Sequence, residues 1–385
     1  MIKILIFIPT FGVGGVLSSL NGLLANLDAS KYQIDVFAFY QVGPFYKKLK
    51  NCNILNENIW LSASIKHGNL IKKGLFYCLL LIKKIIRIFN KDIDKIVKNL
   101  GTKSLNLPKY DIVIAFSETL LDFVCDLNAA KKTIWLHSIY TRYRNMVDSQ
   151  GDIDKFHILN KIVCVSEFAR RDFLSVYPQL SEKTIVIPNQ LDKKEIVTKS
   201  LCQEWIDPRF KTDIFTIISL GRLDPVKQFS KIPTIARKIK ESCNIPFRWY
   251  IIGGSRSDKR EEYLIKSAIK ENDVSNIVIM LGEKTNPYPY LAKSNLFVHT
   301  SKSETFGIVI SEANLLCIPV IVNDFGCAPE MVKNGENGFV VNVNDMHLCI
   351  SDILTSPDTL RTVKERLISH NVSVRNEDTL KQLLK

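Results

Sequence analysis

Short apolar runs alternate with helical patterns along the chain. Each run is rich in β-branched residues, and its continuous apolar character is typical of a strand buried on both faces. In the first half of the chain these runs are 2–8, 34–39, 112–116, 133–136, 162–165 and 184–187. In the second half they are 215–220, 248–252, 276–281, 296–300, 319–322 and 338–341. Such regular alternation of strand and helix predicts parallel sheets with helices on both faces.

The alternation pauses at residues 188–212, which are polar, contain Pro188 and Pro208, and are expected to form an irregular connection. A chain of 385 residues corresponds to about two or three domains. We therefore expect an α/β fold with two doubly wound, Rossmann-like domains and a ligand in the cleft between them. The expected parts are 1–195, 196–365 and a C-terminal helical segment, 366–385.

Charge is distributed unevenly. The chain carries 52 Lys and Arg against 39 Asp and Glu, and residues 1–110 alone hold 16 basic against 5 acidic residues. A nucleic-acid-binding protein more often spreads its basic residues or interleaves them with aromatic ones. The pattern therefore favours a phosphorylated small molecule or a membrane surface as the acidic partner, and no nucleic acid.

The cysteines and the apolar runs indicate a cytoplasmic protein. The nine cysteines are scattered singly without a CxxC pair, which is typical of reduced thiols and not of a disulfide framework or a zinc site. The apolar run at 2–8 leads into a glycine loop without a cleavage site, so we expect no signal peptide. The run at 74–82 is nine residues long, too short to span a bilayer.

Segment 301–341 carries the strongest candidate chemistry. Glu304 and Glu312 are eight residues apart, and an apolar helical pattern begins between them. The residues at the predicted helix N-terminus are Phe306, Gly307 and Ile308. Unpaired N–H groups at a helix N-terminus suit a phosphate, and Glu312 can accept hydrogen bonds from vicinal ribose hydroxyls. Either glutamate alone would be typical of a solvated helix surface.

A second candidate site follows the strand at 215–220. Gly221 allows close approach of the backbone, and Arg222 and Lys227 can grip a pyrophosphate, the arginine bidentately. Taken in isolation, such a pair is more often ordinary surface charge. Another strand, 248–252, also runs into glycines, of which Gly253 is a candidate contact.

These segments resemble the retaining GT-B glycosyltransferases of family four. The family pattern has Glu, seven residues and Glu, with Phe-Gly after the first, and here Pro319-Val320, Glu330 and Asn337-Gly338 follow as in the family. The Gly-Arg-Leu loop with a lysine five residues after the arginine also matches, although Gln228 stands where the family usually has glycine. The resemblance covers about residues 1–350.

The resemblance assigns roles to these residues. It implies that Glu304 faces the donor sugar, that the amides of residues 306–308 contact sugar and phosphate, and that Glu312 holds the ribose. It also implies that Arg222 and Lys227 hold the donor diphosphate and that Gly253 lines the nucleotide pocket.

First-domain candidates rest on weaker matches. Gly14 and Gly15 lie in a loop that fails the dinucleotide fingerprint because Leu17 replaces its last glycine. The resemblance places this loop on the acceptor side, and the alternative is a tight turn without a ligand. His137 ends a strand, where a lone histidine is more often structural. The resemblance places it at the cleft, beside the donor sugar.

Metal use is not expected. Asp-x-Asp occurs at Asp92/Asp94 and at Asp152/Asp154, but both pairs lie in helical patterns and not after a strand, as the metal-binding motif of GT-A transferases does. The only small molecule expected besides the acceptor is the nucleotide diphosphate sugar.

Residues 70–100 predict a basic amphipathic helix. Apolar residues repeat every three or four positions, and Lys84, Arg87, Lys91, Lys95 and Lys98 follow the same spacing on another face. The functional interpretation is docking on an anionic leaflet, at the inner face of the cell membrane. The alternative is a helix packed on the sheet with a solvated basic face.

Taken together, these expectations predict that the protein is a retaining hexosyltransferase. It would move a hexosyl unit from a UDP-sugar to a saccharide or lipid-linked acceptor in surface polysaccharide assembly. Two alternatives remain open: a GT-B epimerase or phosphorylase, and a non-catalytic module that binds a nucleotide sugar or a membrane.

Overall fold

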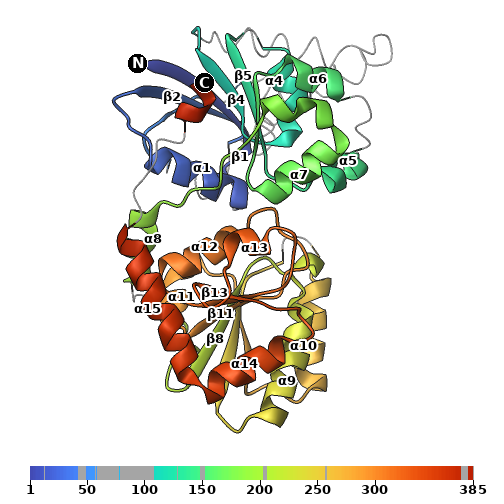
Figure 1. The fold of residues 1–385 in the computed structure, drawn as a ribbon, viewed down its shortest axis with the longest axis vertical. Helices are drawn as coiled ribbons and strands as arrows, with labels where there is room; N and C mark the ends of the chain where they lie inside the picture. The colour runs from blue at the N-terminus through green and yellow to red at the C-terminus, as the bar shows by residue number, and fades with distance from the viewer. Residues whose placement is uncertain are drawn as a thin grey trace. The chain divides into compact units, whose positions relative to one another are not determined.

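A computed structural model describes most of the chain. The described residues are 1–12, 14–41, 49–56, 58, 78, 108–127, 129–147, 152–202, 206–255, 258–373 and 380–384. The chain divides into two compact units, one formed by residues 1–190 and 377–385 and the other by residues 191–376. Each unit has its own sheet with helices beside it (Figure 1).

The first unit contains a parallel seven-stranded sheet in the order β3-β2-β1-β4-β5-β6-β7. Its strands are β1 (Ile2–Thr10), β2 (Tyr32–Tyr40), β3 (Asn53–Ile54), β4 (Ile112–Ala115), β5 (Lys131–Leu136), β6 (Lys161–Cys164) and β7 (Thr184–Val186). All six runs predicted from the sequence are strands. The two-residue β3 was not predicted, because two residues carry no detectable period.

Helices of the first unit follow the strands. They are α1 (Gly15–Ala25), α4 (Leu121–Cys125), α5 (Tyr140–Val147), α6 (Ile153–Ile158), α7 (Glu167–Val176) and α16 (Lys381–Leu384), with 3-10 turns η2 (Glu118–Leu120) and η3 (Pro178–Lys183). Ser166 caps α7 by accepting a hydrogen bond from the Ala169 amide at 3.0 Å. The hydroxyl of Ser19 on α1 donates to Asn189 at 2.6 Å and ties that helix to the end of the unit.

The second unit repeats this architecture with six parallel strands. They are β8 (Phe215–Leu220), β9 (Phe247–Ile252), β10 (Val278–Gly282), β11 (Leu296–His299), β12 (Val320–Val322) and β13 (Gly338–Val340). The order β10-β9-β8-β11-β12-β13 is the doubly wound order of a Rossmann-like sheet. The predicted fold class, α/β with two such domains, is confirmed, as are the six predicted strands of this half.

Helices cover the second sheet. They are α8 (Lys193–Ser200), α9 (Ile232–Ser242), α10 (Arg260–Glu271), α11 (Tyr288–Ala292), α12 (Ile308–Leu315), α13 (Ala328–Met331), α14 (Met346–Thr355) and α15 (Pro357–Ser373), with 3-10 turns η4 (Pro225–Lys227) and η5 (Phe229–Lys231). Buried residues of α9, such as Ile232 and Ile239, pack in one core with Met346 and Ile350 of α14. Figure 1 shows α9, α10 and α14 along one side of this sheet.

The segment 188–212 differs from the expectation of an irregular connection. It contains α8, whose N-cap Asp192 accepts a hydrogen bond from the Glu195 amide at 3.0 Å. Ile196 is the buried residue of this helix, so the sequence lacks the apolar stripe that would have predicted it. The unit boundary at 190/191 precedes this helix, whereas the boundary expected at 195 falls inside it.

Both sheets reverse their direction of growth between their first and fourth strands. In the second unit this point lies between β8 and β11, which are neighbours in the sheet. Loops that leave the carboxyl ends of two such strands diverge to opposite faces and leave room for a ligand. The loops after β8 and β11 are those that carry Arg222, Lys227 and Glu304. No helix among the described residues is both long enough and apolar enough to cross a bilayer.

Candidate functional site

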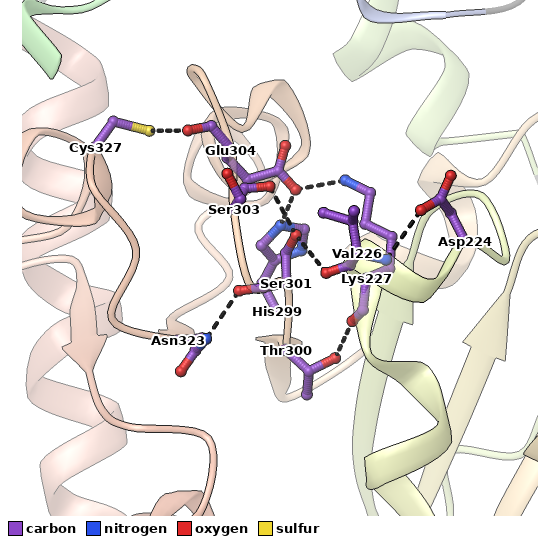
Figure 2. A network of polar contacts seen from close by, with 10 residues as sticks. All are labelled: Asp224, Val226, Lys227, His299, Thr300, Ser301, Ser303, Glu304, Asn323 and Cys327. Atoms are coloured by element: carbon purple, nitrogen blue, oxygen red, sulfur yellow. Dashed lines mark hydrogen bonds and ion pairs between the residues drawn. The ribbon is translucent and has the colours of Figure 1, made fainter. Parts of the chain in front are cut away.

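Lys227 and Glu304 meet at the carboxyl edge of the second sheet. The Lys227 ammonium lies 2.5 Å from Glu304 Oε1, and the two side chains are 19% and 15% exposed (Figure 2). Lys227 ends η4, a turn capped by Asp224, whose carboxylate accepts from the Val226 amide at 2.9 Å. The sequence placed these two residues in separate motifs, and the fold brings them into one ion pair.

Hydrogen bonds to main-chain carbonyls hold the two loops against each other. The Thr300 hydroxyl donates to the Lys227 carbonyl at 2.7 Å, and the Lys302 amide donates to the Val226 carbonyl at 2.8 Å. Ser301 adds a hydroxyl bond to the same Val226 carbonyl at 3.2 Å. The ion pair is therefore supported by backbone contacts that do not depend on charge.

His299, the last residue of β11, also contacts Glu304. Its Nε2 lies 2.8 Å from Glu304 Oε1, the same oxygen that Lys227 contacts. The ring is fully buried, stacked on Phe297 and edge-on to Phe325 at centroid distances of 5.9 and 6.0 Å. Burial lowers the pKa of His299, so the ring is neutral and Nε2–H donates to the carboxylate.

Glu304 is an anion in this environment. Burial would raise its pKa, but the hydrogen bond from His299 and the charge of Lys227 outweigh burial and hold the pKa of this carboxyl well below its usual range. His299 was not predicted as a site residue, because it ends an otherwise apolar strand. The sequence does contain a signal for it: a polar residue ends that strand, five positions before Glu304.

Helix α12 begins beside this cluster. Gly307 is its N-cap in the left-handed region, with φ 74°, and a Cβ at this position would lie 2.8 Å from Ile310 Cδ1 and 3.9 Å from Glu304 Cγ. Only glycine adopts this conformation without strain here. The predicted helix N-terminus at Phe306–Ile308 is confirmed, and it lies next to Glu304. A helix N-terminus with free amides favours an anion.

Glu312 lies in a separate pair on the same helix. It accepts a hydrogen bond from the hydroxyl of Tyr288, on α11, at 3.0 Å. Burial raises the pKa of Glu312 to about 7, and the Tyr288 bond limits that rise. Tyr288 is a site neighbour that the sequence analysis missed, because residues 24 apart on two helices share no local pattern.

The glycine loops contact each other through their backbones. A Cβ on Gly253 would lie 1.7 Å from the Gly221 carbonyl oxygen, so no other residue fits without moving the loop after β8. The Gly253 amide donates to the Gly282 carbonyl at 3.0 Å. A Cβ on Gly221 would lie 3.6 Å from the aliphatic part of the Lys227 side chain. Gly253 is thus placed beside the predicted diphosphate loop.

Arg222 and Lys227 occupy different environments. Arg222 is exposed, and within the described part of the chain it has no ion pair. It lines a pocket of about 480 Å³ together with Leu223, Asp224, Pro225, Asp258, Arg260, Glu261 and Leu264. Lys284, in the loop after β10, pairs with Asp207 at 2.9 Å.

First-unit candidates also lie at strand ends. Gly14 caps α1 and Gly15 begins it, directly after β1 and residues 11–13. His137 follows β5, with its ring 4.8 Å from that of Phe116, and its amide donates to the Glu118 carboxylate at 3.2 Å. Burial lowers the pKa of His137 to about 3, and its Nε2 is buried without a hydrogen bond to any described residue.

The predicted helix context of the second Asp-x-Asp pair is confirmed. Asp152 precedes α6 and accepts from Lys155 at 2.9 Å and from the Tyr140 hydroxyl at 3.3 Å. Asp92, Asp94 and all of the helix expected at 70–100 except residue 78 lie outside the described residues. In the ranges that are described, no group of three or more His, Cys, Asp or Glu side chains could hold a metal ion.

Comparison with known proteins gives a family-model match within the second unit. Residues 204–366 match the family model of glycosyl transferases group 1. An uncharacterised glycosyltransferase of Methanocaldococcus jannaschii is 28% identical over 187 residues, 48% of this chain and 44% of its own length. The Escherichia coli UDP-Gal:alpha-D-GlcNAc-diphosphoundecaprenol alpha-1,3-galactosyltransferase is 27% identical over 208 residues, 52% of this chain and 50% of that protein.

A solved structure matches the whole chain. The crystal structure of Anabaena HepE in complex with UDP and glucose aligns with a TM-score of 0.71 and 17% identity, over 100% of this chain and 98% of that one. This likeness establishes the GT-B fold. The sequence matches span half or less of the length of these two curated relatives. The family-model match is confined to residues 204–366, and the likeness to HepE shows the fold.

Proposed function

We propose that this protein transfers a hexosyl unit from a UDP-sugar to a saccharide or lipid-linked acceptor, with retention of the anomeric configuration. The observation that carries the proposal is the gathering of Lys227, Glu304 and the α12 N-terminus at one edge of the second sheet. The E. coli relative uses a UDP-sugar and a diphosphoundecaprenol-linked acceptor by its name, which supports both substrate classes.

The donor diphosphate would meet positive charge from three directions. Arg222 and Lys227 follow β8, and the free amides of α12 begin at residues 306–308. Guanidinium, ammonium and helix N-terminus are the groups that stabilise phosphate oxygens most effectively. Glu312 would accept hydrogen bonds from the ribose hydroxyls, and Glu304 would face the sugar.

The largest rate acceleration would come from groups that contact the leaving diphosphate. As the bond between the sugar C1 and the diphosphate oxygen breaks, negative charge grows on that oxygen, and preorganised cations stabilise it. The acceptor oxygen forms the new bond to C1 on the same face, and its proton passes to the leaving diphosphate. His137, neutral at physiological pH, would supply a hydrogen bond to the sugar or the acceptor.

We propose that no metal takes part, because Arg222, Lys227 and the α12 N-terminus can together balance a diphosphate. Initial rates should be the same in EDTA as in buffer. Loss of activity on chelation that manganese or magnesium restores would contradict this part of the proposal.

The proposed setting is surface polysaccharide assembly at the inner face of the cell membrane. Residues 70–100 would dock on anionic lipid, with about 1 kcal/mol from each basic residue near the surface. Replacing Lys84, Arg87, Lys91, Lys95 and Lys98 by glutamine should release the protein from phosphatidylserine vesicles, and added salt should do the same. Equal binding of both proteins would leave the alternative of a packed helix.

The test of the transferase proposal has two stages. Thermal shifts with UDP-glucose, UDP-galactose and their N-acetylamino forms should identify a stabilising donor, since a ligand of the native state raises stability by mass action. UDP release should then depend on an acceptor such as GlcNAc-diphosphoundecaprenol. Conversion of the donor without an acceptor would indicate an epimerase, and binding without turnover a non-catalytic module.

A further inference from the structure

Glu304 is held by two anchors that contact one oxygen. Lys227 Nζ and His299 Nε2 lie 2.5 and 2.8 Å from Oε1, and the other carboxylate oxygen takes part in neither contact (Figure 2). The glutamate main chain is also held, because the Cys327 thiol donates to its carbonyl at 3.3 Å. Fixing one carboxylate oxygen leaves the other in a defined direction.

The two anchors differ in rigidity. Lys227 is 19% exposed and reaches Glu304 with a long flexible side chain whose charge the proposed function assigns to the diphosphate. His299 is fully buried between two phenylalanine rings and lies on a strand in register with β12, where its carbonyl accepts from the Asn323 amide at 2.9 Å. A ring held in this way has one orientation.

A donor diphosphate would compete with Glu304 for the same ammonium. If Lys227 turned toward phosphate oxygens, its ion pair with Glu304 would lengthen and one anchor would be lost. The histidine bond does not depend on charge at the diphosphate and persists. The anchor that remains in the donor complex is therefore His299.

We propose that His299 is a positioning residue of the donor site, which keeps Glu304 oriented toward the sugar after Lys227 has engaged the diphosphate. This inference rests on the proposed function. The groups that face the Glu304 carboxylate are the neutral His299 ring and the Lys227 ammonium. The Cys327 thiol behind it stays protonated, because burial raises its pKa to about 12.

Two substitutions of His299 separate positioning from packing. His299→Leu removes the donor and keeps an apolar side chain between the phenylalanine rings. His299→Gln places an amide N–H where Nε2–H was. The control is Ser219→Ala, which does not touch Glu304. It removes two equally buried hydrogen bonds, from the Ser219 hydroxyl to the Val298 carbonyl at 2.6 Å and from Trp249 Nε1 to that hydroxyl at 3.0 Å.

Kinetics on the UDP-sugar that wild type uses fastest should follow the donor hydrogen bond. We expect His299→Leu to lower kcat by about 10–100-fold with little change in donor KM, since supporting groups act through the orientation of the residue they hold. His299→Gln should recover most of that loss, and Ser219→Ala should lower Tm without lowering kcat. Wild-type kcat in His299→Leu, or equal losses in both His299 variants, would overturn the proposal.

A second readout needs no donor. In protein labelled with ¹³C at glutamate carboxyls, the Glu304 resonance is assigned with Glu304→Gln. It should keep its ionised position in wild type and in His299→Gln down to the lowest pH at which these proteins stay folded, and it should titrate at a higher pH in His299→Leu. An unchanged titration in His299→Leu would overturn the positioning role. If no UDP-sugar is turned over by wild type, the proposed function fails, and this titration still decides whether His299 holds the carboxylate.

Discussion

The two units each place a histidine at the carboxyl end of a parallel strand, and the two histidines behave differently: His137 is half-buried and His299 is fully buried. His137 follows β5 in the first unit, and its ring contacts Phe116 and no described carboxylate. His299 ends β11 in the second unit, and its ring donates to Glu304. Burial lowers the pKa of both. A position at the end of a strand therefore does not by itself define the role of a histidine. The role depends on whether a neighbouring loop brings a carboxylate to the ring.

Removing the charge of Glu304 would make the environment of His299 resemble that of His137. Glu304→Gln keeps the shape and removes the anion that, in the proposed function, meets the sugar as charge develops. We expect kcat to fall by about 10²–10³-fold, the range observed when a preorganised electrostatic group is removed. Donor affinity, measured by calorimetry, should change much less. A variant with a normal kcat and weakened donor binding would show that Glu304 acts in the ground state only.

Glu312 tests whether the donor site extends along α12. Glu312→Ala should lower UDP affinity by about 10–150-fold, because a hydrogen bond to a charged group contributes about 1.5–3 kcal/mol. Since burial raises the pKa of Glu312 to about 7, wild type should bind UDP more weakly at pH 6 than at pH 8. Glu312→Gln should remove that dependence. Calorimetric titrations that give one affinity for all three proteins at both pH values would exclude a ribose contact.

The smallest expected effect concerns the stability that His137 contributes. Its pKa falls from 6.5 to about 3 on folding, so below pH 6.5 the unfolded chain binds a proton that the native state excludes. The free energy of unfolding should therefore be unaffected above pH 6.5 and fall below it, by about 1.4 kcal/mol per pH unit. Urea unfolding at pH 7.5 and 5.5 measures the loss.

His137→Phe is the matched control for that titration. The phenyl ring fills the same volume beside Phe116 and cannot bind a proton. The variant should lose less stability than wild type between the two pH values. Identical losses would mean that the His137 ring is solvated in the native state.

The sequence predicted most of the fold and part of the site. Continuous apolar runs predicted twelve strands, and the Phe-Gly before an apolar pattern predicted the N-terminus of α12, because each of these signals is local. The Lys227–Glu304 pair joins residues 77 apart. It follows from the adjacency of β8 and β11, a property of the sheet order that no local pattern contains.

One departure from the family pattern has a visible physical meaning. Gln228, which stands where glycine is usual, adopts the left-handed conformation with φ 53° directly after Lys227. Glycine is the residue that adopts this conformation without steric cost. The loop keeps the conformation that a glycine would favour, and the steric cost falls on Gln228.

The binding roles assigned to Gly14, Gly15 and Gly253 stay predictions. The backbones of these glycines also have a structural function, as turns and contacts.

UDP binding to a variant without the two diphosphate cations tests the account most directly. Arg222→Ala/Lys227→Ala should remain folded, since neither side chain is part of the buried core. The control Lys240→Ala removes an exposed lysine that pairs with Asp273, away from the site. Calorimetry should show normal UDP binding by wild type and the control, and binding at least 10-fold weaker in the double variant, about 1.4 kcal/mol. Equal UDP affinity in all three proteins would place the diphosphate elsewhere and contradict the proposed donor site.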